Sequence, residues 1–345
     1  MKLYLAGNSQ YSGVWEYIAR EHEKALLSYH YLENEDKPFW QKTLIKMKDA
    51  NNKVNLFLDS GAFSAKTQGV EINIEEYIQF IKDHQQYLEV YANLDVIGDP
   101  AGTWKNQMIM EAEGLKPLPV FHHGEDLKWL HRYLNRGYDY IALGGMVKTS
   151  NLSMWLDDLF LNHLCDPNGI PKVKIHAFGM TSLKLMIRYP WYSVDSTSWV
   201  VTGRLGAIYV PRFRNGVWIY DENSWKIAVS NKSPTTKDAG KHITTLSPKQ
   251  REIIMHYVHD KGFVFGKSLY KTEKLPYDLE DNEKWVDKKI VGQITREVEI
   301  IKEAGISNMY QLRDEINIQY FMDLEKSMPE WPWSFKKTEV LNGFF

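Results

Sequence analysis

Short apolar segments alternate with helical segments between Leu3 and Val194, and this alternation constrains the fold more than any other feature. Strands that alternate with helices favour right-handed crossovers and a parallel sheet. About eight such strands in a stretch of this length predict a closed (β/α)₈ TIM barrel, with an open doubly wound sheet as the competing arrangement. The expected strands are Leu3–Ala6, Ala25–Tyr31, Val54–Leu58, Leu88–Leu94, Leu118–Phe121, Tyr140–Leu143, Val173–Ile175 and Trp191–Val194, and Ile208–Pro211 is one further candidate.

The segments between these strands have the apolar spacing of helices. They are Val14–His22, Phe39–Asp49, Ile74–His84, Ala101–Glu113, Asp126–Asn135, Asn151–His163 and Ser182–Tyr189. The pattern changes after Pro211. We therefore expect a TIM-barrel catalytic domain over residues 1–211 and an appended α+β region over residues 212–345.

We expect the appended region to bind nucleic acid, and several of its elements can be predicted. Val217–Ile219 and Trp225–Val229 predict a hairpin around Tyr220–Asn223, and residues 231–244 predict a polar loop. Three helices are expected next: one capped by Thr245 with Gly262 past its end, one over Val291–Ala304 and one over Met309–Asp323.

Composition limits the possible classes of function. The single cysteine, Cys165, excludes an intrachain disulfide and any zinc site built from several cysteines, and it fits a cytoplasmic protein. The start of the chain lacks the apolar core of a signal peptide, and no apolar stretch has the length of a membrane span, so no membrane partner is expected. With a net charge of −2, any nucleic-acid partner must be held by a local basic patch.

Polar residues and glycines follow almost every expected strand. They are Asp59, Asp95, His122 with His123, Gly144 with Gly145, His176 and Asp195. Caps and turns use the same residue types, so one such residue would mean little. Their recurrence on nearly every strand predicts a site at the C-terminal rim of a barrel, where barrel enzymes carry their chemistry. Asp59 and Asp195 together indicate acid/base or nucleophilic chemistry at a carbon centre.

Four motifs give these residues a family resemblance. LDSGAFSA (58–65) resembles the Asp-Ser-Gly-Gly motif of tRNA-guanine transglycosylases, and LDVIGDP (94–100) resembles their base-recognising segment. YIALGGMV (140–147) resembles their Gly-Gly strand end. IHAFGMTSLKLMIRYPWYSVDSTSW (175–199) resembles the stretch that leads to their nucleophilic aspartate. The likeness covers Leu56 to Trp199 in the same order. The family, which includes the queuine and archaeosine tRNA-ribosyltransferases, has a TIM-barrel fold.

The resemblance implies roles for individual residues. Asp195 matches the nucleophile that attacks C1′ of a nucleoside, and Asp59 matches the carboxylate that handles protons on the departing and arriving bases. Asp95 matches the residue that accepts hydrogen bonds from guanine. The other expected substrate-binding residues are Ser60, Gly61, Phe63, His122 or His123, Gly144, Gly145 and His176, with core packing as the alternative reading of Phe63 and His176.

The departures from the family bear on the substrate. Ala62 and Ser64 replace Gly and Gln of the first motif, and the family's zinc site after the nucleophile is missing. Phage and bacterial DNA-guanine transglycosylases, which insert a 7-deazaguanine such as preQ0 into DNA, therefore resemble this chain most. The partners implied are DNA with a flipped-out guanine and a free 7-deazaguanine base, without a cofactor or metal. If the chain is phage-encoded, its location is the host cytoplasm.

Basic residues are the candidates for holding DNA phosphates. They are Lys148, Arg188, Arg204, Arg212, Arg214 and Lys237, of which Arg212–Gly216 follows the expected barrel directly. Three alternatives stay open: a zinc-free tRNA-guanine transglycosylase, a non-catalytic nucleic-acid-binding barrel and an ordinary glycoside hydrolase. The sequence leaves the oligomeric state open.

Overall fold

The chain divides into two structural units. The computed structural model describes residues 1–7, 12–34, 46–47, 49–51, 53–146, 150–233, 235, 237–287 and 290–335. One unit comprises Met1–Thr197 together with Glu325–Phe345, and the other comprises Ser198–Leu324. The second unit is thus an insertion in the sequence of the first.

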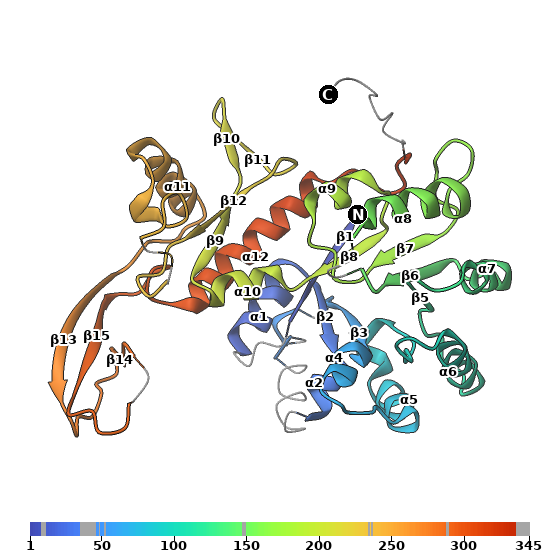
Figure 1. Cartoon of the computed structure of the whole chain (residues 1–345), viewed down its shortest axis with the longest axis horizontal. Coiled ribbons are helices and arrows are strands. Elements are labelled where there is room, and N and C mark those ends of the chain that lie inside the picture. The colour runs from blue at the N-terminus through green and yellow to red at the C-terminus, as the bar shows by residue number, and fades with distance from the viewer. Residues whose placement is uncertain are drawn as a thin grey trace. The chain divides into compact units, whose positions relative to one another are not determined.

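The first unit is built on a sheet of eight parallel strands in the order β4-β3-β2-β1-β8-β7-β6-β5 (Figure 1). Their bounds are β1 Lys2–Ala6, β2 Lys24–Ser28, β3 Asn55–Asp59, β4 Leu88–Tyr91, β5 Val120–His122, β6 Tyr140–Gly144, β7 Lys174–Ala177 and β8 Ser193–Ser196. The edges β4 and β5 are joined beyond their ends, where Ala92 pairs in parallel with Leu118 and the Asn93 amide donates to the Leu118 carbonyl at 2.9 Å. The sheet therefore curls into a TIM-type barrel, as predicted.

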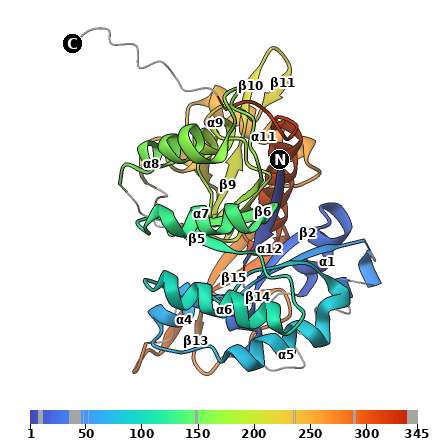
Figure 2. The ribbon, with the colours of Figure 1, turned by 90° about the vertical axis from the view of Figure 1, so that its right-hand side faces the viewer.

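Helices follow the strands and lie outside the curved sheet (Figures 1 and 2). They are α1 Ser12–Glu21, α2 Tyr29–Asn34, α4 Ala62–Thr67, α5 Ile74–His84, α6 Pro100–Ala112, α7 Leu127–Arg136, α8 Leu152–Leu159 and α9 Leu183–Arg188, with a 3₁₀ turn at Gln85–Tyr87 and a π turn at Phe160–Leu164. Side-chain caps from Asn73, Asp99 and Asp126 begin α5, α6 and α7.

Two sequence expectations for the first unit differ from the structure or fall outside it. The expected strand Ala25–Tyr31 ends at Ser28, and Tyr29 begins α2. The expected helix Phe39–Asp49 lies largely outside the described residues.

Apolar side chains on alternate strand positions fill the barrel interior. Tyr4 and Ala6 of β1, Phe57 of β3 and Val120 of β5 belong to one buried cluster, and the Tyr4 and Phe57 rings meet edge to face at 5.4 Å. The intervening residues Leu3, Leu5, Leu56 and Leu58 are also buried. Strands buried on both faces read as continuous apolar runs, which is why the pattern is so clear in the sequence.

The last described residues pack against the end of the barrel at which its strands begin. Glu325 accepts a hydrogen bond from the Leu3 amide at 3.0 Å and pairs with Lys24 at 3.2 Å. The Trp331 indole donates to the Pro190 carbonyl at 3.1 Å, and Phe335 stacks on Tyr189 at 5.3 Å. These contacts tie the returning chain to the segments that enter β1, β2 and β8.

The second unit combines small sheets with helices. Its elements are α10 Ser198–Arg204, β9 Ala207–Val210, β10 Arg212–Arg214, β11 Val217–Ile219, β12 Trp225–Ala228, a 3₁₀ turn at Ile243–Thr245, α11 Pro248–Asp260, β13 Lys267–Lys274, β14 Glu283–Trp285, β15 Thr295–Glu303 and α12 Tyr310–Ser327, whose last turn belongs to the first unit. Ile208, Ile227, Ile254, Tyr257 and Ile316 meet in its core. Strands β13, β15 and β14 form one antiparallel sheet, in that order.

Several expectations for this region were wrong. The predicted hairpin around Tyr220–Asn223 does not form, because β11 pairs with β10 and β12 pairs with β9. Val291–Ala304 is not a helix, since β15 occupies most of it. Ser247, not Thr245, caps α11, in a capping box with Gln250. The units divide at Thr197 rather than at Pro211, because β9 pairs with β12 and not with a barrel strand.

We expect Phe57→Ala to destabilise the first unit by about 3–5 kcal/mol, because the substitution leaves a cavity inside the barrel. Phe63→Ala is the matched control, since the Phe63 ring is 64% exposed, and it should change the free energy of unfolding by only about 0.5 kcal/mol. Urea unfolding followed by circular dichroism measures both. Equal losses for the two variants would contradict the interior position of Phe57.

Candidate active site

The C-terminal rim of the barrel brings the predicted site residues together. Asp59 is the last residue of β3, His122 the last of β5 and Gly144 the last of β6. Asp195 lies in β8, and Asp95 follows β4 by a short loop. The negative charges of Asp95 and Asp195 both act on the Asp59 carboxyl group. Three carboxyl groups from three strands therefore share one end of the barrel.

Asp59 holds its proton more tightly than an ordinary aspartate. Burial, followed by repulsion from Asp95 and Asp195, raises the pKa of Asp59 to about 7. Hydrogen bonds from the backbone amides of Gly61 and Ser60 oppose this rise without cancelling it. A carboxyl group with a pKa near neutrality can both donate and accept a proton under physiological conditions.

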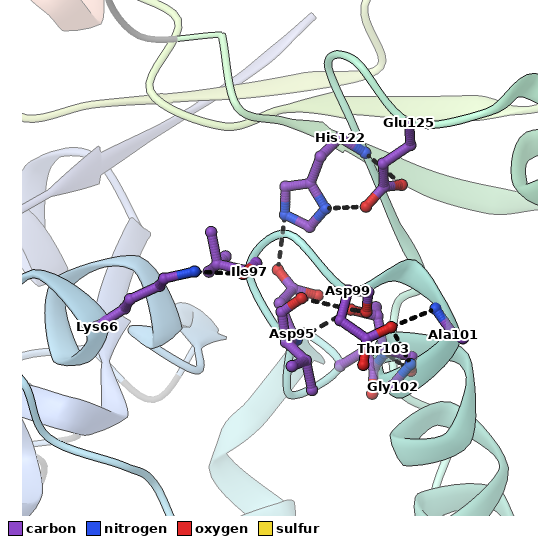
Figure 3. Close-up of polar contacts among 11 residues, drawn as sticks. Lys66, Asp95, Ile97, Asp99, Ala101, Gly102, Thr103, His122 and Glu125 are labelled. Carbon is purple, nitrogen blue, oxygen red and sulfur yellow. Dashed lines mark hydrogen bonds and ion pairs between the residues drawn. The ribbon is translucent and has the colours of Figure 1, made fainter.

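Asp95 is held by an imidazole from the neighbouring strand (Figure 3). Nε2 of His122 lies 3.1 Å from Oδ2 of Asp95, and Nδ1 of His122 lies 3.1 Å from Oε1 of Glu125. The Glu125 carboxylate also accepts the His122 amide at 3.0 Å. Burial alone would lower the pKa of His122, but the charge of Asp95 and hydrogen bonds to both carboxylates outweigh it and raise that pKa to about 10. His122 is therefore an imidazolium that bridges two carboxylates.

One oxygen of Asp95 has no partner within the described part of the protein. Its Oδ1 atom is buried and has no hydrogen-bond partner among the described residues. Buried acceptors are normally satisfied, so an orphan oxygen at a barrel rim indicates a place where a donor from a ligand fits. Glu125 was not predicted. The His-x-x-Glu spacing directly after an expected strand was the available signal.

Loops after neighbouring strands fix the position of Asp95. Lys66 of α4 donates to the Ile97 carbonyl, and the Val96 amide donates to the Thr103 hydroxyl at 2.9 Å (Figure 3). Asn93 is fully buried and donates to the Thr103 carbonyl at 2.9 Å. The segment that carries Asp95 is thus fastened to α4 and to the first turn of α6.

Asp195 lies at the end of a buried chain of polar contacts. Its Oδ1 atom accepts the Gly179 amide at 2.8 Å and lies 3.3 Å from Nε2 of His176. Nδ1 of His176 lies 2.7 Å from the Ser193 hydroxyl, which lies 2.6 Å from the Tyr140 hydroxyl. Burial lowers the pKa of His176 against the opposing effect of Asp195, so the ring is neutral.

The donors and acceptors in this chain of contacts can be assigned in one consistent way. Nε2 of His176 is buried and has no well-aligned hydrogen-bond partner, so the Asp195 oxygen at 3.3 Å is the acceptor that its N–H faces. Nδ1 must then accept from Ser193, and Ser193 from Tyr140. His176 is thereby held as the Nε2–H tautomer, with a donor directed at Asp195.

Two glycines at the rim allow neighbouring side chains to lie directly against the backbone. A Cβ atom on Gly144 would lie 2.7 Å from the His122 ring, so this position is reserved for glycine by the imidazole that holds Asp95. Gly61 has a φ of 76°, and a Cβ there would lie 2.3 Å from the Ser28 hydroxyl. Gly145 is exposed beside the rim.

The remaining expected ligand-binding residues differ in exposure. Phe63, in the first turn of α4, is 64% exposed and free to meet a ligand. Ser60 is buried and its hydroxyl accepts the Ala62 amide at 3.4 Å, so this side chain serves the turn. Of the two adjacent histidines, His122 contacts Asp95, whereas His123 packs edge to face on Trp155 at 4.9 Å.

The basic residues expected to hold phosphates are placed as follows. Arg212 lies over the Trp225 ring and donates to the Asn223 carbonyl, Arg214 pairs with Glu222, and Arg188 pairs with Asp157. Arg204 and Lys237 are exposed. Lys148 lies outside the described residues.

Two further searches of the described part of the chain gave no candidates. No three His, Cys, Asp or Glu side chains there are arranged to hold a metal ion. No helix in it has the length and apolar character needed to cross a membrane.

Comparison with known proteins gives little beyond the fold. No protein-family model matches the chain, and no curated protein matches its sequence. Among solved structures, the chain is similar to a type I 3-dehydroquinate dehydratase from Clostridium difficile, covalently modified by comenic acid. The two share 11% identity with a TM-score of 0.40, over 57% of this chain and 84% of the other. A likeness this weak carries no argument about activity.

We expect the two rim histidines to differ in charge near pH 8. His122 should be an imidazolium, because its pKa is raised to about 10, whereas His176 should be neutral with its proton on Nε2. Histidine ¹⁵N chemical shifts measure both states directly. Asp95→Asn should lower the pKa of His122 and leave the His176 signals unchanged. A neutral His122 in the parent protein would contradict the proposed bridge.

Asp59→Asn should stabilise the protein at high pH. A carboxyl group with a raised folded-state pKa contributes stability below its unfolded pKa of about 4, and that contribution is lost as the pH rises to about 7. The variant lacks this loss, so its advantage over the parent should grow between about pH 4 and pH 7 and then level off. Urea unfolding of both proteins across this range gives the comparison. A constant difference would show that the Asp59 pKa is ordinary.

Proposed function

We propose that this protein is a DNA-guanine transglycosylase that exchanges guanine in DNA for a 7-deazaguanine base such as preQ0. The observation that carries the proposal is the meeting of Asp59, Asp95 and Asp195 at one barrel rim, with Asp59 poised near neutrality. The ordered resemblance of the surrounding motifs to guanine transglycosylases assigns a separate role to each of the three. The environment of each carboxyl group suits the role assigned to it.

The first half-reaction uses Asp195 as the nucleophile. A carboxylate oxygen of Asp195 bonds to C1′ of the target nucleotide while the bond from C1′ to guanine N9 breaks. The electron pair of that bond leaves with guanine, and Asp59 supplies the proton that neutralises it. The Gly179 amide and the neutral His176 direct donors at Oδ1 of Asp195, which fixes the orientation of the carboxyl group.

The second half-reaction reverses these roles. The incoming 7-deazaguanine gives its N9 proton to Asp59, and N9 then bonds to C1′ while the ester to Asp195 breaks. Atoms and charges balance without a cofactor, because one base replaces another at the same carbon. A general acid that becomes a general base between two steps needs a pKa near the working pH, and that of Asp59 is raised to about 7.

Asp95 suits the recognition of guanine. The imidazolium of His122 holds Oδ2 at 3.1 Å, and Oδ1 has no partner among the described residues. An ionised carboxylate only accepts hydrogen bonds, which matches the adjacent N1–H and amino donors of guanine. Phe63, exposed beside the same rim, provides a ring for contact with a base.

DNA is proposed as the substrate because the chain cannot build the zinc site of the tRNA enzymes, since it has a single cysteine. A guanine in duplex DNA must leave the base stack to reach a barrel rim. Acting on DNA therefore requires a surface that holds the phosphate backbone while one base is extruded.

Incubation of the protein with a radiolabelled 7-deazaguanine and either DNA or tRNA tests this proposal. Label should enter DNA, and Asp195→Ala should abolish its incorporation. Asp59→Asn should slow exchange by about 10²–10⁴-fold, the usual contribution of a general acid. A covalent protein–DNA band should survive denaturation for the parent protein and be absent for Asp195→Ala.

Two results would contradict the proposal. Label that enters tRNA alone would replace DNA by tRNA as the substrate. Base exchange that persists in Asp195→Ala would show that Asp195 is not the nucleophile. DNA affinity of Asp195→Ala equal to that of the parent is the matched control, because it shows that the variant still presents a folded binding surface.

A further inference from the structure

A groove on the outside of the barrel unit has a strongly basic lining. It has a volume of about 570 Å³ and is lined by Trp104 of α6 and by Lys128, His131, Arg132, Asn135 and Arg136 of α7. Three of these six residues carry a permanent positive charge and none is acidic. Because the whole chain has a net charge of −2, this face is locally distinct.

The basic lining follows from the amphipathic pattern of α7. Leu130 and Tyr133 of this helix are buried against the barrel, which turns Lys128, Arg132 and Arg136 toward solvent. These three lie four residues apart, so they form one row with about 6 Å between successive positions along the axis. A regular row of single positive charges matches a polymer that carries single negative charges at regular intervals.

Aromatic rings hold the guanidinium groups in place. Arg132 lies over Trp129 at 4.6 Å and over Trp104 at 5.1 Å, and Arg136 lies over Trp104 at 5.8 Å. Two of the three cations have an acidic neighbour: Arg136 pairs with Glu111 at 2.7 Å, and Lys128 pairs with Asp126 at 3.3 Å. Arg132 makes no ion pair with a described carboxylate, so its N–H donors are available. Pre-positioned guanidinium groups lose less entropy when they bind phosphate.

We propose that this groove binds the phosphodiester backbone of a nucleic acid. The inference rests on the proposed function in naming nucleic acid as the partner, and it adds the surface. Lys128 begins the row only six residues after His122, at the rim end of α7. A strand bound along the row therefore leads to the Asp95–His122 pair. Recognition through phosphates alone is independent of base sequence.

A membrane surface fits this groove less well than a nucleic acid does. Peripheral membrane binding combines basic residues with apolar side chains that enter the lipid. None of the large apolar side chains found exposed in the described part of the chain lies on α6 or α7. The groove offers charge and hydrogen-bond donors without an apolar wedge.

Fluorescence anisotropy with labelled guanine-containing DNA, in the absence of free deazaguanine, tests the surface. The groove variant is Lys128→Ala/Arg132→Ala. The control is Arg20→Ala/Lys53→Ala, which removes two exposed cations that precede the first residues of β2 and β3. The groove variant should bind at least about 10-fold more weakly at low salt, and its slope of log Kd against log salt should fall by about 2. The control should stay within about twofold of the parent.

Unchanged affinity and salt slope in the folded groove variant would overturn the proposal, as would parent protein that binds anionic vesicles but not DNA. Circular dichroism and the unfolding midpoint verify that the variant is folded. Failure of the proposed function has a different signature. DNA binding that depends on the groove, without any base exchange, would support the groove proposal and contradict the transglycosylase proposal. Base exchange that does not depend on the groove would support the transglycosylase proposal and contradict the groove proposal.

Discussion

Crowding of negative charge at one barrel rim is the constraint on which the site depends. Three carboxyl groups delivered by parallel strands repel one another in a partly buried place, and each is accommodated differently. Asp95 contacts the His122 imidazolium, Asp195 contacts the Gly179 amide and the neutral His176, and the raised pKa of Asp59 favours its protonated form. Three identical side chains therefore lie in three different environments, and under the proposed function this difference separates the general acid, the guanine-binding residue and the nucleophile.

The barrel and its rim could be predicted because their signals are local. Each strand is a short apolar run buried on both faces, and each site residue directly follows such a run. Parallel connections then bring those ends to one rim whatever the details of the helices. Glu125 was missed because its one signal, the His-x-x-Glu spacing after a strand, does not by itself show that the Glu125 carboxylate turns back to the His122 imidazole.

The second unit was harder to predict because distant partners decide its strands. Residues 295–303 contain three Glu, one Arg and one Lys, which favour a helix, yet they pair with β13 and β14. Buried Arg296 and Val298 alternate with exposed Glu297, a short period-2 signal that helix propensity hid. The hairpin β10–β11 did carry a local signal, Asn215-Gly216, whose positive φ angles suit a tight turn between strands.

The return of the chain from Glu325 onward has a consequence for biosynthesis. Glu325, Trp331 and Phe335 cover the end of the barrel where β1, β2 and β8 begin, yet the ribosome makes them only after Ser198–Leu324. The barrel unit is therefore the first to be started during synthesis and the last to be completed. During synthesis the barrel lacks these contacts until the whole second unit has been made.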